Sequence, residues 1–85
     1  MLKIIFNSLD YLQLLKNIGK LSEGIKMNAE ENEICLLGSK ESFESIIDIL
    51  SNNLAESGVD ENDNINSIGL TIERLIDIIS NKLWD

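Results

Sequence analysis

The sequence contains no histidine, no proline and a single cysteine among its 85 residues. Without histidine it lacks the usual general base near neutral pH and the commonest zinc ligand. Without proline, its helices are free of the kinks that this residue causes. Cys35 has no partner for an internal disulfide and lies in an apolar stretch, so we expect a buried, reduced thiol and a cytoplasmic protein.

Aromatic residues and long apolar runs are also scarce. No apolar run approaches the ~20 residues of a membrane span. The apolar stretch at residues 1–6 is interrupted by Lys3 and is too short for a signal peptide, so we expect none. Aromatics make up 5% of the chain against 44% hydrophobic residues in all, which predicts a mainly aliphatic core. The length predicts a single domain over residues 1–85.

Basic residues are few, and the acidic ones are concentrated in one segment. Residues 28–63 hold ten of the fifteen carboxylates and one base, Lys40, for a segment charge of −9 within a net charge of −8. Residues 1–27 carry +2 and residues 64–85 carry −1. Such a field repels nucleic acid and anionic membranes and attracts basic surfaces. We therefore expect no direct nucleic-acid or membrane binding.

Two segments of the chain resemble each other. Phe43–Leu54 (FESIIDILSNNL) and Ile72–Leu83 (IERLIDIISNKL) are identical at seven of twelve positions. The apolar residues of each fall mostly on one helical face, which predicts two equivalent amphipathic helices with Ile47 and Ile76 among the buried residues. A duplicated strand–helix unit and convergence of two core helices both explain the similarity. Ile49 and Ile78 lie off that face. We expect each of them to contact either a second core layer or a partner.

Local signals bound these helices and the strands between them. Ser39 is expected to cap the first helix, and Gly58 is expected to end it in a left-handed conformation. Thr71 is expected to cap the second, with Leu70 and Leu75 as a hydrophobic staple. Three segments have strand patterns, with a hairpin loop at residues 29–32 between the first two. These strand segments are Gly24–Asn28, Glu33–Gly38 and Ile65–Leu70.

The N-terminal stretch fits two descriptions. Leu9–Leu21 is a candidate helix that Ser8 can cap, while Leu2–Phe6 is either a strand or a backward extension of that helix. We favour the continuous helix. The expected fold is then α+β, a small domain of three short antiparallel strands packed with three amphipathic helices in the order α-β-β-α-β-α. A mostly α fold is the alternative.

No catalytic or metal-binding pattern stands out. Asp60, Asn62 and Asn64 match the first, third and fifth positions of a calcium-binding EF-hand loop. However, Ile65 stands where the sixth position requires glycine, and Thr71 where the twelfth requires a bidentate glutamate. The spaced pairs Glu44/Asp48 and Glu73/Asp77 are expected on exposed helix faces. We therefore expect a protein that is not an enzyme, with no cofactor and no metal.

The acidic residues are the candidate binding site for a basic protein partner. If the hairpin loop lies beside the next helix, their carboxylates merge into one acidic face. Solubility alone is the competing explanation of that charge. The expected contact residues are Glu30, Glu31, Glu33, Glu41, Glu44 and Asp48, with Asp60, Glu61 and Asp63 as a second patch.

The stretch ICLLGSKESFESIIDIL combines a short strand, Gly38–Ser39, an acidic turn with Phe43 and an amphipathic helix. In this it resembles small immunity proteins of bacterial polymorphic and contact-dependent toxin systems. The resemblance covers about a fifth of the chain and carries no residue role across. It implies an inhibitor that binds its cognate toxin near or over the active site.

Three functions follow as hypotheses. The first is a stoichiometric inhibitor, an immunity protein or antitoxin that neutralises a basic toxin, most readily a nuclease. The second is a phage-encoded acidic mimic of DNA that blocks a defence complex. The third is a homo-oligomeric regulatory or structural subunit, which makes a homodimer possible. Trp84 is in this context either a lid on the edge of the core or an interface anchor.

Overall fold

The computed structural model describes residues 1–58, 61–62 and 64–84. Three strands and three helices follow in the order β-α-β-β-α-α within that part of the chain. Their bounds are β1 Leu2–Asn7, α1 Ser8–Ile18, β2 Ile25–Ala29, β3 Glu33–Gly38, α2 Lys40–Ser57 and α3 Ser67–Leu83. The α+β class is confirmed, with three antiparallel strands and three helices, whereas the expected order α-β-β-α-β-α is wrong.

The strands form one antiparallel sheet with β3 in the centre and β1 and β2 at its edges. The register places Ile4, Leu36 and Met27 side by side on one face, and Ile5, Cys35 and Asn28 on the other. Ile4 and Leu36 are buried, while Ile5 is 47% exposed. The core therefore lies on the Leu36 face of the sheet.

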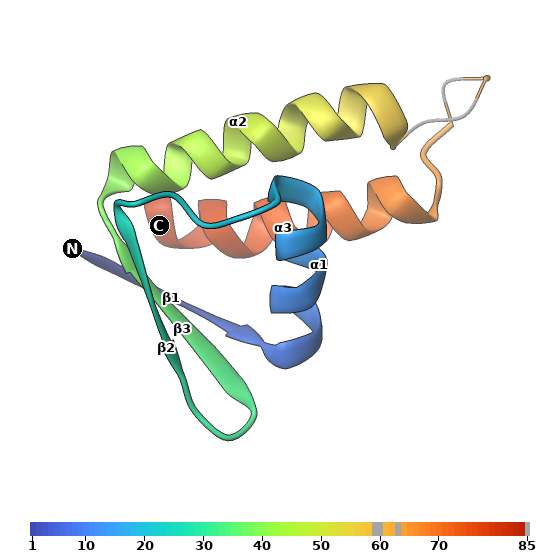
Figure 1. Cartoon of the computed structure of the whole chain (residues 1–85). Helices are drawn as coiled ribbons and strands as arrows, with labels where there is room; N and C mark the ends of the chain where they lie inside the picture. The colour runs from blue at the N-terminus through green and yellow to red at the C-terminus, as the bar shows by residue number, and fades with distance from the viewer. Residues whose placement is uncertain (59–60, 63, 85) are drawn as a thin grey trace.

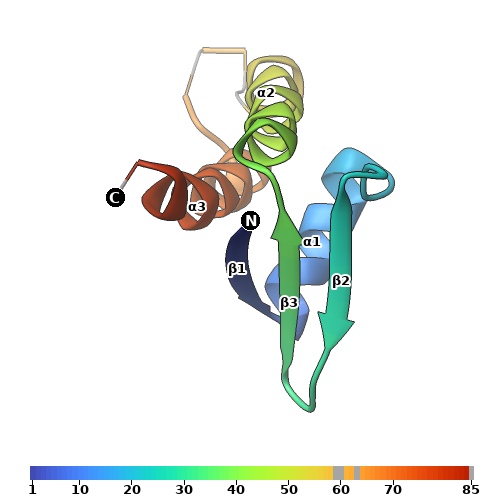
Figure 2. The ribbon, with the colours of Figure 1, turned by 90° about the vertical axis from the view of Figure 1, so that its left-hand side faces the viewer.

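The helices cover that core in two groups. Figures 1 and 2 show α2 and α3 side by side and antiparallel, near the end of the sheet where β3 leads into α2. In the same views α1 stands beside the strands, and the β2–β3 hairpin extends away from α2 and α3. The hairpin tip therefore lies far from the two long helices. No helix in the described part of the chain combines the length and the apolar character needed to cross a membrane.

The N-terminal stretch forms a strand, so the favoured continuous helix is wrong. Alternate residues of β1 are buried, with Ile4 and Phe6 each 1% exposed and Ile5 facing out. Pairing along the whole length of β3 and this period of two outweigh the weaker helical spacing. Asn7, not Ser8, caps α1, since its side chain accepts a hydrogen bond from the Asp10 N–H.

The third expected strand, Ile65–Leu70, is also wrong, because α3 begins at Ser67. The Asn66 side chain accepts a hydrogen bond from the Gly69 N–H at 2.8 Å and caps this helix in place of Thr71. Leu70 is 57% exposed and inside the helix, so the expected staple with Leu75 does not form. The N-cap at Ser39 is confirmed by the bond from the Ser42 N–H at 3.1 Å.

The two similar helices bury the same positions of their shared pattern. Phe43, Ile46 and Leu50 are the buried residues of α2 within the pattern. Ile72, Leu75 and Ile79 are their counterparts in α3. Ile47 and Ile76, expected among the buried residues, are only half-buried at the side of each stripe. Ile78 packs against the core from one side, while Ile49 is 42% exposed.

Gly58 ends α2 for a different reason than expected. Its φ of −89° is right-handed, so no left-handed turn requires a glycine here. Instead, the Gly69 N-terminal turn of α3 packs directly on it, and a Cβ on Gly58 would lie 3.0 Å from the Gly69 Cα. The Asn66 N–H donates to the Gly58 carbonyl at 2.9 Å. The two glycines thus allow the backbones of α2 and α3 to touch.

Candidate functional site

The acidic residues of α2 lie along one flank of the helix. Helix geometry turns each residue by about 100°, so Glu44 and Asp48 project from the same side of the buried stripe of α2. Glu41 lies about 20° from Asp48 around the helix, two turns earlier. Glu41 and Asp48 are exposed and Glu44 is half-exposed. The flank is held in place because the opposite side of α2 contributes Phe43 to the core.

Helix α3 carries a matching pair of carboxylates. Glu73 and Asp77 occupy the same positions in the pattern as Glu44 and Asp48, and both are exposed. A groove of about 380 Å³ between the helices is lined by Glu73 and Asp77 together with Leu54 and Ile76. Since α2 and α3 pack side by side and antiparallel (Figure 1), these carboxylates lie on two adjoining helices. We call this the acidic helix surface, and it comprises Glu41, Glu44, Asp48, Glu73 and Asp77.

The sequence-based candidate set contained only the α2 half of this surface. The similarity of the two helices already placed Glu73 and Asp77 at positions equivalent to Glu44 and Asp48. The packing of α3 against α2 could not be read from that similarity. This packing places two carboxylates of a nearly neutral segment on a helix that adjoins α2.

The hairpin residues Glu30, Glu31 and Glu33 form a separate group. The Glu30 N–H donates to the Glu33 carbonyl at 2.8 Å, which places these two residues opposite each other at the tip. All three are exposed. Since β3 leads from Glu33 to Gly38 before α2 begins, the tip lies roughly 17 Å from the start of α2 along the strand. The expected merging of the two groups into one face does not occur.

The second expected patch is only partly described. Glu61 is exposed in a turn between α2 and α3. Asp60 and Asp63 lie outside the described residues.

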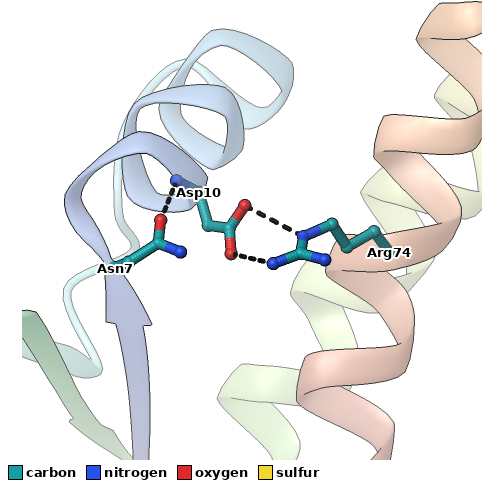
Figure 3. A network of polar contacts seen from close by, with 3 residues as sticks. All are labelled: Asn7, Asp10 and Arg74. Carbon is teal, nitrogen blue, oxygen red and sulfur yellow. Dashed lines mark hydrogen bonds and ion pairs between the residues drawn. The ribbon is translucent and has the colours of Figure 1, made fainter.

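Charge neutralisation is rare among the described carboxylates. Within residues 1–58, 61–62 and 64–84 one ion pair forms, between Arg74 on α3 and Asp10 on α1. Figure 3 shows the guanidinium facing the carboxylate through two hydrogen bonds, each 3.1 Å long. The hydrogen bond to Asp10 and the attraction between the charges raise the pKa of the Arg74 guanidinium above its ordinary value. The acidic helix surface has no such ion pair.

Nothing in the described part of the chain assembles reactive groups. Cys35 is buried with an exposure of 8%, as expected from its apolar neighbours. Among the described residues no cluster of three or more histidine, cysteine, aspartate or glutamate side chains is arranged to hold a metal ion. Trp84 is 60% exposed, so it does not act as a lid over the core.

Comparisons with protein-family models, curated proteins and solved structures give no match to this chain.

Proposed function

We propose that this protein is an acidic stoichiometric inhibitor, an immunity protein or antitoxin, that neutralises a basic toxin by covering its active or substrate-binding surface. The toxin is proposed to be a nuclease. The observation that carries the proposal is the acidic helix surface, where carboxylates on two adjoining helices are exposed or half-exposed and have no ion-pair partner among the described residues.

Charge complementarity is the physical reason for a nuclease target. A nuclease presents positive charge to the phosphates of its substrate. Exposed carboxylates repel one another, and the approach of cations lowers their electrostatic free energy. Because the resulting field extends beyond contact distance, it also speeds the encounter with a basic protein.

The groove beside Glu73 and Asp77 supports a protein partner over a small ion. Leu54 and Ile76 are half-buried and line this groove together with the two carboxylates. Protein interfaces commonly combine an apolar centre with a polar rim. The buried residues of the helices already fix their main chain, so binding costs little further main-chain entropy.

The first experiment is a search for the partner and its activity. The tagged protein is used to capture partners from its native host in low and in high salt. We expect a basic nuclease that salt releases and whose activity falls to zero at equimolar inhibitor. Failure of a captured partner to show inhibited activity, or capture only of acidic proteins, would overturn the proposal.

Two matched charge-reversal variants then test the binding surface. Glu44→Lys with Asp48→Lys changes the acidic helix surface, and Glu30→Lys with Glu31→Lys changes the hairpin tip by the same net charge. We expect the helix variant to slow association with the basic partner at least tenfold, and the tip variant to slow it only slightly. Equal effects would mean that net charge alone acts, and a larger effect at the tip would place the contact there.

A further inference from the structure

Strand β2 is an open edge of the sheet. Among the described residues it pairs only with β3, in the strand order β1-β3-β2. In an antiparallel ladder alternate residues direct both main-chain groups toward the partner strand, and the others direct them outward. The bond from the Glu30 N–H to the Glu33 carbonyl sets this alternation. It directs Asn28 and Lys26 toward β3, and Ala29, Met27 and Ile25 toward the free edge.

Most of these outward groups have no partner within the described residues. The Ile25 N–H donates to the Ser22 carbonyl at 3.1 Å. The N–H and carbonyl of Met27, the N–H and carbonyl of Ala29, and the carbonyl of Ile25 remain toward solvent. Such a row of free groups is a template for another strand.

The side chains of this edge are apolar on the core side of the sheet. Met27 aligns with Leu36 and Ile4, yet it is 48% exposed, and Ala29 is also exposed. The hairpin extends away from α2 and α3 (Figure 1), and the described chain leaves Met27 about half uncovered and Ala29 exposed. No bulge interrupts the register of β2. Lys26, on the opposite face, is the only charged residue in the strand.

We propose that a second copy of this chain pairs with β2, antiparallel and about a twofold axis at Met27. This register places Met27 opposite Met27 of the second copy, and Ile25 opposite Ala29. The outward N–H and carbonyl of Met27 then meet the same groups of the other copy, so each N–H donates to the opposing carbonyl. The Ala29 N–H donates to the Ile25 carbonyl of the other copy, in both directions.

Charge favours a second copy at this edge over other surfaces of the molecule. Each copy carries a net charge of −8, so contact through the acidic helix surface is repulsive. On the outer face of β2, Lys26 lies opposite Asn28 of the second copy and diagonal to its Glu30. Diagonal neighbours lie ~7–8 Å apart, within reach of a lysine side chain. The two Lys26 side chains are also diagonal to each other, so each Lys26 has one diagonal carboxylate and one diagonal ammonium group, and no like charges lie directly opposite each other within β2.

A short edge interface is small, and we expect association that depends on protein concentration. Sedimentation equilibrium up to about 1 mM protein is expected to show a monomer–dimer equilibrium. Met27→Lys brings two ammonium groups together and is expected to weaken the dimer at least tenfold. Ile5→Lys is the matched control, because Ile5 is 47% exposed on the other edge strand. A monomer throughout, or equal weakening by both variants, would overturn the proposal.

A disulfide test checks the register. In a Cys35→Ala background, Met27→Cys places the two sulfurs in a pair whose Cα atoms are about 5.5 Å apart, within reach of a disulfide. Asn28→Cys, one residue along, leaves its two copies more than ~7 Å apart, beyond that reach. Under mild oxidation we expect a covalent dimer from Met27→Cys and little from Asn28→Cys. This register would be overturned by equal yields from the two variants. It would also be overturned if sedimentation shows a dimer but Met27→Cys forms no disulfide. Circular dichroism confirms that each variant is folded.

Discussion

Asp10 shows how one side chain links distant parts of the chain. It lies in the first turn of α1, is 9% exposed, and receives two hydrogen bonds from Arg74, 64 residues later. Its own N–H is held by Asn7, which caps the helix. A carboxylate with so little contact with water needs its partner. The sequence shows both residues but offers no sign that they meet, since the pairing depends on how α3 crosses α1.

A double-mutant cycle at this pair gives the first prediction. Asp10→Asn and Arg74→Gln are each expected to lower the melting temperature by a few degrees. The double variant is expected to lose less than the sum of the two, because either change alone already breaks the pair. Glu73→Gln, also on α3, is the control. Strict additivity would show that the pair does not contribute to stability.

The raised pKa of Arg74 fixes the pH dependence of its contribution. Its folded pKa lies above the ordinary value of an arginine side chain, because Arg74 donates hydrogen bonds to Asp10 and is attracted by its charge. A raised pKa in a base stabilises the fold at every pH below the ordinary value, and the effect is lost only as the pH rises past it. The stabilising effect of Arg74 is therefore constant across the neutral range and disappears only in strong alkali.

Burial within each helix gives the second prediction. Ile46→Ala and Leu75→Ala remove fully enclosed side chains and are expected to cost about 2–5 kcal/mol in the free energy of unfolding. Ile47→Ala and Ile76→Ala, at the half-buried neighbouring position, are expected to cost clearly less. Urea denaturation measures all four. Larger losses at Ile47 and Ile76 would contradict the helix orientation described here.

At the scale of elements, the sequence predicted what depends on local pattern. The helical spacing of residues 43–54 and 72–83 was sufficient to predict two helices, because it is strong and occurs twice. The segment Glu33–Gly38 was predicted as a strand because it is short and apolar. The errors at Leu2–Phe6 and Ile65–Leu70 have a common cause. Pairing with β3 made the first a strand, and the Asn66 cap and the contact with Gly58 made the second a helix. Both causes are tertiary or depend on a single capping side chain.

The acidic site divides in the same way. Periodicity predicted that Glu44 and Asp48 share a flank, and the structure places them so. Periodicity could not show that the hairpin tip lies apart from α2, because that separation follows from the direction of β3. It also could not assign Glu73 and Asp77 to the same surface, since this depends on antiparallel packing of two helices.

The contact between Gly58 and Gly69 gives the third prediction, at the junction of α2 and α3. A Cβ on Gly69 would collide with the Gly58 carbonyl oxygen. Gly69→Ala is therefore expected to destabilise the protein by about 1–3 kcal/mol despite alanine's better helix propensity. Leu70→Ala, at the adjacent exposed position, is expected to change stability little. No loss on Gly69→Ala would mean that the two helices separate at no cost.

At the scale of the whole molecule, the acidic helix surface and the β2 edge lie on different parts of the fold. α2 and α3 pack near the end of the sheet, while the hairpin extends away from them (Figure 2). A dimer through β2 therefore leaves both acidic helix surfaces free. The two proposals together predict one partner per copy, two per dimer. The failure of either proposal would leave the other standing.

The charge distribution gives the last prediction, which needs no partner. With a net charge of −8 and one ion pair among the described residues, repulsion between carboxylates opposes folding. Raising the salt concentration from 0.01 M to 1 M shortens the screening length from about 30 Å to about 3 Å. We expect the urea midpoint to rise with salt. In a Glu44→Gln, Asp48→Gln variant we expect a smaller rise, and greater stability than the unchanged protein at low salt.

The uncharged changes Ser51→Ala and Asn52→Gln on the same helix are the control and should keep the original salt dependence. A midpoint that falls with salt would show that attractive pairs outweigh repulsion, and the acidic helix surface would then not be the unneutralised cluster on which the proposed binding of a basic partner rests.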